Sequence, residues 1–390
     1  MKNDMLSSKT RIHILVNCFW KSGMSGGDRR VIEIAKCWNI IPEIDISVYA
    51  PKSFTSIVEK EIPGIKTFVT DVDLEEDAGI LKAYYKRTKN LVHILKKSVS
   101  NGDVIYSSSD IMPDVIPALY CKKHLGAKWV LLTHHINEKF YKRPGNIASN
   151  FISCMQQVWG ISRGAKYADL YFVISPQVME EFRRRKYDLN KIHRVDNAVD
   201  LELIDSSKEE VASYEATFMA RLNPSKGVME LPTIWRRVVD TIPKARLAII
   251  GKGNAEMVGN LRNEIARLGL DDSIDLFGFV ESKKGYSLIK NSKCFLFTSH
   301  EEGWGIAVAE ALACSTPVVA YNLPVFSVLF PKGVLMNTLG DINNMAQDVL
   351  DLLKDDKRRS VLGEEGNGYI RSHYSWGYIA KEEIEYINSL

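Results

Sequence analysis

Short, uninterrupted apolar runs alternate along this chain with longer amphipathic stretches. Continuous apolar runs of this length are typical of strands buried on both faces, as in parallel sheets. The amphipathic stretches between them have the length and the periodicity of helices, and this alternation is typical of βα units. The sequence therefore predicts an α/β fold built on parallel sheets.

The expected strands fall into two series of five. The first series begins at Ile12, Asp45, Val104, Lys128 and Asp169, and the second at Ala216, Ala245, Ile274, Lys293 and Thr316. A chain of 390 residues is also too long for one ordinary hydrophobic core, so two domains are expected. We therefore predict two Rossmann-like, doubly wound parallel-sheet domains that face a cleft.

A polar, acidic segment separates the two series and is predicted to be the linker, between about Asp196 and Glu215. The expected domains are residues 1–196 and 197–372. In doubly wound sheets, ligands bind outside the carboxyl ends of the strands. The loops that follow the expected strands are therefore where functional residues should lie.

Composition excludes several classes of protein. With 51 Lys and Arg against 48 Asp and Glu, the net charge is +3, so we expect no nucleic-acid partner. The six cysteines form no Cys-x-x-Cys pair, which argues against a zinc site or a disulfide framework and favours the cytoplasm. The polar start MKNDMLSSKT predicts no signal peptide, and no apolar run reaches the roughly 18 residues of a spanning helix.

The most informative motif runs from Ser299 to Pro324. A strand is expected to end near Ser299, a glycine-rich loop follows, and a helix is expected to begin around Ile306. Free amides at a helix start favour a bound phosphate. Glu302 in the loop and Glu310 in the helix could accept hydrogen bonds from paired hydroxyls. The pattern predicts a site for a sugar–phosphate–ribose ligand, with a glycine loop and two solvated glutamates as the alternative.

A second motif lies after the strand that begins at Ala216. Arg221 stands at the end of this strand, and Lys226-Gly227 opens the next helix. Two cations at these positions could bind both phosphates of a diphosphate and neutralise it as a leaving group. A solvated loop with two basic residues is the alternative.

These two motifs resemble the Glu-x7-Glu family of retaining GT-B glycosyltransferases, with Trp304 where the family usually has Phe. The resemblance implies that Glu302 contacts sugar hydroxyls, that Glu310 binds the ribose, and that Arg221 and Lys226 bind the diphosphate. It also implies donor contacts from the loop formed by Gly303, Trp304, Gly305, Ile306 and Ala307.

Two further segments of the second half match the same family. Gly251 and Gly253 follow the expected strand LAII, although a Gly-x-Gly fits any βα turn. The resemblance places this loop beside the nucleotide. It also implies that the backbone near Phe279 and Val280 contacts the base, so residue types do not identify the base.

In the first half, Gly26 and Gly27 precede a helix expected near Asp28. They resemble the family's N-terminal glycine loop, and a plain βα turn is the alternative. His134 and His135 follow the strand that begins at Lys128. The family's Thr-x-His pattern selects His135 as the residue near the reacting sugar, with His134 as the second choice.

The resemblance implies a mechanism and a partner set. The donor is a nucleotide-diphosphate sugar, UDP- or GDP-linked, and the acceptor attacks from the face of the leaving group, so that the configuration is retained. A phosphate oxygen takes the acceptor proton, and neither a metal nor another cofactor is expected. The terminal helix, residues 373–390, is expected to pack on the first domain.

The acceptor is the least determined partner. Aromatic and basic residues mix in KFYKRPG from Lys139, and Phe151, Met155, Val158 and Trp159 share one expected helix face. Residues 139–160 could form a peripheral membrane contact for a lipid-linked acceptor, or the stripe could be core. A soluble sugar or glycan acceptor stays open.

Two other functions compete with sugar transfer. One is a GT-B nucleotide-sugar epimerase, which would need acid–base carboxylates. The other is a non-catalytic sugar-nucleotide-binding scaffold. Both Glu302 and Lys226 are present, and together with the other donor-side residues they favour transfer.

Overall fold

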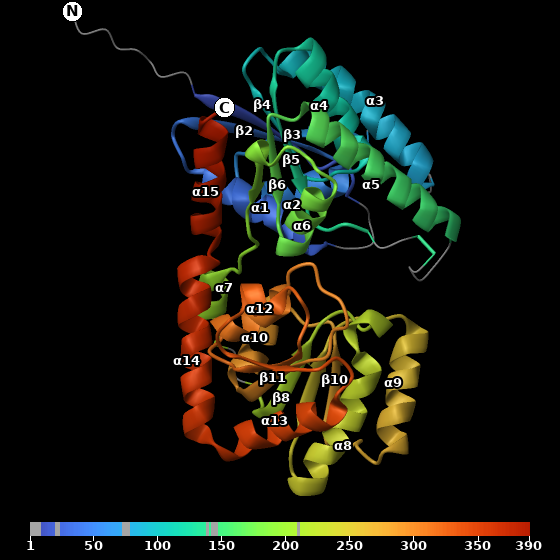
Figure 1. Ribbon diagram of the computed structural model, residues 1–390, viewed down its shortest axis with the longest axis vertical. Helices are drawn as coiled ribbons and strands as arrows, with labels where there is room; N and C mark the ends of the chain where they lie inside the picture. The colour runs from blue at the N-terminus through green and yellow to red at the C-terminus, as the bar shows by residue number, and fades with distance from the viewer. Residues whose placement is uncertain (1–8, 20–23, 72–78, 138–139, 142–146, 209–210) are drawn as a thin grey trace, which may run out of the picture. The chain divides into compact units, whose positions relative to one another are not determined.

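The structure is a computed structural model that describes residues 9–19, 24–71, 79–137, 140–141, 147–208 and 211–390 (Figure 1). The chain forms two compact units. The first contains Met1–Asn197 and Trp376–Leu390, and the second contains Ala198–Ser375. The start of the chain, where the absence of a signal peptide was predicted, lies outside the described residues up to residue 8.

The first unit is built on a seven-stranded sheet in the order β3-β2-β1-β4-β5-β6-β7, in which every pair is parallel. The strands are β1 (Thr10–Leu15), β2 (Ile44–Ala50), β3 (Lys66–Val69), β4 (Val104–Ser107), β5 (Lys128–Thr133), β6 (Leu170–Val173) and β7 (Ile192–Arg194). The strand order reverses between β1 and β4, where Leu15 pairs with Ser107. Ligands of doubly wound sheets bind at such a reversal.

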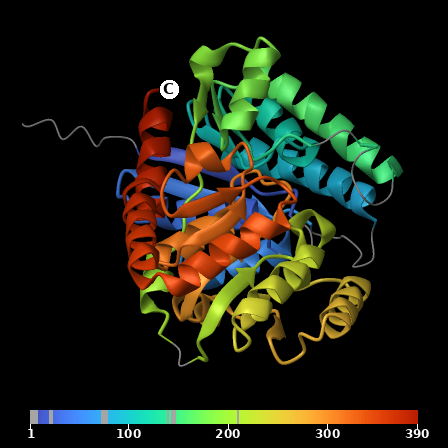
Figure 2. The same cartoon turned by 60° about the horizontal axis from the view of Figure 1, so that its bottom comes forward.

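Helices cover both faces of this sheet. They are α1 (Gly26–Asn39), α2 (Lys52–Glu61), α3 (Ile80–Ser98), α4 (Met112–His124), α5 (Ile147–Tyr167), α6 (Pro176–Arg184), the 3₁₀ turn η1 (Leu189–Lys191) and α15 (Trp376–Asn388). Leu95 of α3, Ala118 of α4, Ile161 of α5 and Phe182 of α6 share one core with Trp129 of β5. Helices α3 to α6 therefore cover one face, and Figures 1 and 2 show α3, α4 and α5 side by side there.

The C-terminal helix α15 packs on α1 around a buried ion pair. Arg30 of α1 and Glu383 of α15 are both fully buried and bonded to each other. The Tyr106 hydroxyl donates to the second Glu383 oxygen at 3.0 Å, and Arg30 donates to the carbonyl of Asp196 at 2.8 Å. The helix expected over 373–390 thus begins at Trp376, because α14 (Asp356–His373) of the second unit ends only three residues earlier.

The second unit is built on a six-stranded parallel sheet in the order β10-β9-β8-β11-β12-β13. Its strands are β8 (Tyr214–Met219), β9 (Leu247–Ile250), β10 (Ile274–Gly278), β11 (Ser292–Phe297), β12 (Val318–Tyr321) and β13 (Val334–Asn337). The order reverses between β8 and β11, where Thr217 pairs with Phe295.

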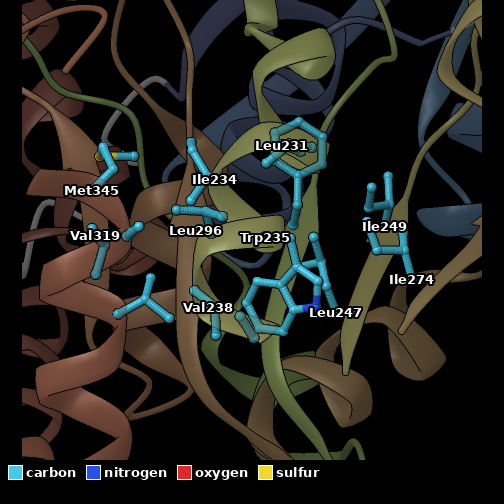
Figure 3. Packing of buried hydrophobic residues seen from close by; sticks show 14 of the residues in the cluster. Leu231, Ile234, Trp235, Val238, Leu247, Ile249, Ile274, Leu296, Val319 and Met345 are labelled. Atoms are coloured by element: carbon cyan, nitrogen blue, oxygen red, sulfur yellow. The ribbon is translucent and has the colours of Figure 1, made fainter. Parts of the chain in front are cut away.

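The helical elements of the second unit are α7 (Leu201–Ser206), η2 (Pro224–Lys226), η3 (Val228–Glu230), α8 (Leu231–Thr241), α9 (Ala255–Arg267), α10 (Ser282–Lys290), α11 (Ile306–Ala313), α12 (Phe326–Leu329), α13 (Ile342–Lys354) and α14 (Asp356–His373). Helix α8 shows how the core of this unit forms. Ile234, Trp235 and Val238 lie on one stripe of α8 and pack with Leu247 and Leu296 of the sheet (Figure 3).

All ten strands expected from the apolar runs are present, and the α/β fold with two parallel-sheet units is confirmed. The structure adds β3, β7 and β13, which were not predicted. Each of the three lies at a sheet edge. Most of their residues are partly exposed, so these strands lack the continuous apolar run that marks a central parallel strand.

The prediction of a linker over Asp196–Glu215 was wrong in one respect. The segment contains helix α7, whose cap is Asp200, and Ile204 of this helix is fully buried. Lys290 of α10 also donates to the carbonyl of Ser207 at 3.1 Å. The polar composition of the segment gives no sign of this short helix. The Asp200 cap and the buried Ile204 side chain hold the helix on the second unit.

The longest described helix is α5, with 21 residues. Neither α5 nor any other helix in the described part of the chain combines the length and the apolar character needed to cross a bilayer.

Candidate functional site

The loop after β8 forms a tight turn at the reversal of the second sheet. Asn223 caps the turn, because its side-chain oxygen accepts hydrogen bonds from the Lys226 amide at 3.2 Å and from the Ser225 hydroxyl at 2.9 Å. Gly227 follows with a φ of +62°, and a Cβ there would lie 2.0 Å from the carbonyl oxygen of Thr298. Only glycine permits this approach, which holds the turn against the loop after β11.

The loop after β11 brings a carboxylate onto this turn. The Thr298 hydroxyl donates to the Lys226 carbonyl at 2.9 Å, and the His300 amide donates to the Ser225 carbonyl at 2.8 Å. The ammonium of Lys226 then lies 2.5 Å from Oε1 of Glu302, with side chains only 16% and 12% exposed. The structure thus joins two residues that the sequence places in separate motifs.

Helix α11 begins at Ile306, as predicted, directly after this carboxylate. Its cap, Gly305, has a φ of +104° and supplies no side-chain acceptor to the first turn. A Cβ at Gly305 would lie 2.7 Å from the ring of Phe326, so a larger residue would push the loop away. The first amides of α11, at Ile306 and Ala307, therefore start a helix with no side-chain cap, which is the arrangement that binds anions.

The side chain of Trp304 points away from this helix start. It is buried, and its ring meets Phe330 and Tyr374 edge-on at centroid distances of 5.4 and 5.0 Å. The aromatic residue therefore anchors the loop, and a ligand contact from Trp304, like one from Gly303, would come from the main chain.

Glu310 lies in the second turn of α11. Its Oε1 accepts a hydrogen bond from the Tyr286 hydroxyl at 2.7 Å. Burial raises the pKa of Glu310 to about 7, and the nearby charge of Asp200 acts in the same direction, whereas the Tyr286 bond opposes it. This carboxyl consequently changes its charge near neutral pH.

Gly251 and Gly253 lie where the loop after β9 crosses the loop after β8. A Cβ at Gly251 would lie 1.8 Å from the carbonyl oxygen of Ala220, and one at Gly253 would lie 2.8 Å from Leu222. The Leu222 amide also donates to the Lys252 carbonyl at 3.0 Å. Packing of the two loops is therefore sufficient to explain both glycines.

Arg221, Phe279 and Val280 also lie at the carboxyl edge of the second sheet. The Arg221 side chain is exposed in the loop after β8. Phe279 directly follows β10 and is 77% exposed, whereas Val280 packs beside a small buried cluster around Tyr214. The predicted base contact of residues 279–280 is thus reachable from solvent.

In the first unit, α1 begins at Gly26, two residues before the expected start near Asp28. Ser25 caps the helix, since its hydroxyl accepts from the Asp28 amide at 3.2 Å while the Asp28 carboxylate accepts from the Ser25 amide at 2.8 Å. This reciprocal capping box was not recognised in the sequence, and it explains the earlier start.

His134 lies directly against the glycine pair. A Cβ at Gly27 would lie 2.9 Å from Nε2 of His134, and this nitrogen is 3.0 Å from the carbonyl oxygen of Ser108. Burial, followed by the charge of Arg30, lowers the pKa of His134 to about 3. The ring is therefore neutral and donates through Nε2. Its buried Nδ1 is then an acceptor that has no hydrogen-bond partner among the described residues.

His135, the first choice from the sequence, is placed differently. It is exposed, and its carbonyl oxygen accepts a hydrogen bond from the Gln157 amide at 2.8 Å. The histidine that the structure brings to Gly27 is His134.

Two buried acids at the same edge were missed in the sequence. Asp110 accepts from the Thr133 hydroxyl at 2.8 Å and from Gln157 at 3.1 Å, and Asp114 accepts from the Asn17 amide at 2.6 Å. Burial raises the pKa of both acids to about 7. The polar run Ser107–Asp110 at the end of an apolar strand was the available signal.

Two Rossmann-like units, each with polar loops at the reversal of its strand order, define the GT-B class of α/β proteins. A solved structure of Anabaena HepE in complex with UDP and glucose has this fold, with a TM-score of 0.76 over 98% of this chain and 100% of that chain. Sequence identity between the two is 17%, so the likeness concerns the fold.

Residues 201–368 match the family model of the glycosyl transferases group 1. The match lies within the second unit and covers less than half of the chain. The matched region contains Arg221, Lys226, Glu302 and Glu310.

The curated relatives are glycosyltransferases of this kind. The chain is 25% identical over 56% of its length to poly(glycerol-phosphate) alpha-glucosyltransferase of Bacillus subtilis, and covers 33% of that protein. It is 20% identical over 61% of its length to GDP-mannose:cellobiosyl-diphosphopolyprenol alpha-mannosyltransferase of Xanthomonas oryzae, and covers 61% of it. The chain thus spans from a third to three fifths of these relatives.

Proposed function

We propose that this protein is a retaining glycosyltransferase that moves a sugar from a UDP- or GDP-sugar to a glycan or lipid-linked acceptor on the cytoplasmic side. The observation that carries the proposal is the contact of Lys226 with Glu302 at the reversal of the second sheet, directly before the start of α11. The family match over residues 201–368 and the sugar-transferring relatives support it.

The second unit is the proposed donor site. Arg221, Lys226 and the first amides of α11 bind the diphosphate, because cations and helix starts both favour phosphate. Glu310 accepts hydrogen bonds from the ribose hydroxyls, and Glu302 from the sugar hydroxyls. The main chain at 279–280 contacts the base.

The same cationic groups serve the chemistry. As the bond between sugar and diphosphate breaks, negative charge develops on the leaving phosphate, and fixed cations stabilise it without reorganisation. The acceptor hydroxyl attacks from the leaving-group side and passes its proton to a phosphate oxygen, so the configuration is retained. In this scheme Arg221 and Lys226 replace a metal ion.

The first unit is the proposed acceptor side. Gly26 and Gly27 allow close approach at the start of α1, and His135 contacts the donor sugar. The unpartnered Nδ1 of His134 is a second acceptor for a sugar hydroxyl at the same edge. Its position against Gly27 makes it the residue to compare with His135 by mutation.

A thermal-shift panel of UDP, GDP, ADP and their sugar conjugates tests the donor site. A ligand that binds only the folded state raises the melting temperature by mass action. We expect one nucleotide class to stabilise the wild type, and we expect the shift to be lost in Lys226→Ala and Glu310→Ala but kept in the surface control Lys244→Ala.

If no nucleotide stabilises the wild type at millimolar concentration, the donor site is refuted. A nucleotide sugar could bind without being turned over. If neither the wild type nor Glu302→Gln releases the nucleotide from a bound nucleotide sugar, with any acceptor or with water, the protein is a non-catalytic scaffold and the proposed enzyme activity is refuted.

A further inference from the structure

The outer surface of α3, α4 and α5 is unusually apolar for a solvent-facing helical layer. Ten of the eighteen exposed large apolar side chains among the described residues lie on these helices or in the residues just before α5. Leu81 and Tyr85 on α3 and Phe151, Met155 and Val158 on α5 are between 47% and 72% exposed. We call this surface the α3–α5 face.

The orientation of α5 explains the exposure. Its core side carries Gly160 and Gly164, where a Cβ would lie 1.8 Å from the carbonyl oxygen of Asp110 and 2.1 Å from Leu131. These glycines bring the helix close to the sheet, and the large apolar residues are then left outside. An ordinary surface helix shows the opposite arrangement. The alternative that the whole Phe151–Trp159 stripe is core is wrong, because only Trp159 packs against the core.

The helices of the α3–α5 face also contain many more basic than acidic residues. The three helices contain ten of the 51 Lys and Arg of the chain but only one of its 48 Asp and Glu. That acid, Asp114, is fully buried, and one of the ten cations, Arg87, is buried as well and pairs with Asp71. Lysines such as Lys82, Lys89 and Lys166 are exposed. The exposed surface of these three helices therefore carries an excess of positive charge although the whole chain is nearly neutral.

We propose that the α3–α5 face docks on the surface of an anionic lipid bilayer. Lysines attract an anionic surface, and exposed large apolar side chains insert at the boundary between headgroups and acyl chains. A soluble polyanion would use the lysines but would leave the apolar side chains in water. A second copy of this chain would place two like-charged faces together, which is unfavourable.

The apolar part of the α3–α5 face lies toward the candidate site. Helices α3 and α5 begin at the carboxyl edge of the sheet, and Leu81 lies in the first turn of α3 and Phe151 in the second turn of α5. His134 and His135 follow β5 at that same edge. If the proposed function holds, docking would bring a lipid-linked acceptor to this edge. The docking itself does not depend on that function.

Co-sedimentation of the full chain with vesicles tests the proposal. The probes are vesicles of phosphatidylcholine alone and of equimolar phosphatidylcholine and phosphatidylglycerol. We expect binding to the anionic vesicles that weakens at least about tenfold when the salt rises from about 0.1 M to about 0.5 M. Binding to phosphatidylcholine alone should be weaker by a similar factor.

Two double variants separate the contributions. Met155→Ser with Val158→Ser removes apolar area, and Lys82→Gln with Lys89→Gln removes charge. Each should weaken binding to the anionic vesicles by about tenfold or more. The matched control, Val361→Ser, changes an equally exposed valine on α14 and should bind like the wild type.

The melting transition of the same variants, recorded with and without nucleotide, shows that they are folded. The proposal is overturned if the wild type stays in the supernatant, or if both double variants sediment like the wild type. It is also overturned if the protein binds soluble polyphosphate but no vesicles, or if light scattering shows a dimer that Met155→Ser with Val158→Ser abolishes. Vesicle binding without any nucleotide shift would refute the proposed function and leave the docking proposal standing.

Discussion

The affinity for the nucleotide sugar should fall as the pH falls from about 8 to about 6, because of Glu310. This carboxyl must be ionised to accept hydrogen bonds from both ribose hydroxyls. Burial has raised its pKa to about 7, so protonation of Glu310 competes with the ligand in a range where an ordinary glutamate is fully charged.

The expected magnitude follows from this pKa. With a pKa of about 7, roughly nine tenths of the protein carries ionised Glu310 at about pH 8, and roughly one tenth at about pH 6. The apparent dissociation constant scales inversely with the competent fraction, so it should rise close to tenfold, or about 1.3 kcal/mol.

Isothermal titration calorimetry at several pH values measures the effect. The ligand should be the nucleotide sugar, since the terminal phosphate of a free nucleoside diphosphate itself titrates near about pH 6. In Tyr286→Phe the hydrogen bond that favours the ionised form is lost, so the transition should move to higher pH. In Glu310→Gln the affinity should be lower and independent of pH.

Equal affinities of the wild type at both ends of this range would refute the argument. So would a pH dependence that persists unchanged in Glu310→Gln, because another group would then be responsible.

Three further predictions concern stability. Gly227→Ala should cost more than about 2 kcal/mol by chemical denaturation, since φ is +62° and a carbonyl occupies the Cβ position, whereas Gly368→Ala, with open space inside α14, should stabilise by up to about 1 kcal/mol. Arg30→Met should cost about 3–5 kcal/mol, because it leaves Glu383 buried without its cation; a loss below about 1 kcal/mol would contradict this. Burial raises the pKa of Asp114 to about 7, so the folded protein binds the proton of this carboxyl more tightly than the unfolded chain does. The resulting stabilisation is complete below the ordinary pKa of an aspartic acid and is lost as the pH rises through about 7. Asp114→Asn should therefore show a smaller drop in melting temperature between about pH 5.5 and about pH 8 than the wild type, and an equal drop would refute this.

Local patterns in the sequence predicted most of the fold. Central parallel strands such as β5 and β11 are continuous apolar runs, since both of their faces are buried. Edge strands such as β13 escaped detection because partial exposure interrupts the run. The start of α11 at Ile306 could be predicted because glycines and the following apolar run mark a helix start within a few residues.

Some features of the candidate site could likewise be predicted from the sequence, and others could not. Lys226 and Glu302 could be identified in their own motifs, but they are 76 positions apart, and only the pairing of β8 with β11 brings them into contact. The raised pKa of Glu310 depends on burial, and Tyr286, whose hydrogen bond opposes the rise, has no motif of its own. Asp110 and Asp114 were missed for the same reason.

The sequence alone determined the α/β class, the strand positions and the residue types at the donor motifs, because these follow from patterns within one βα unit. Only the tertiary structure decided that His134 rather than His135 packs on Gly27, and that Phe151 and Met155 face solvent. Adjacent histidines look equivalent in sequence, and an apolar stripe looks the same whether it is covered or exposed. The neighbours that distinguish these cases come from other strands and helices, which meet only when the sheet assembles.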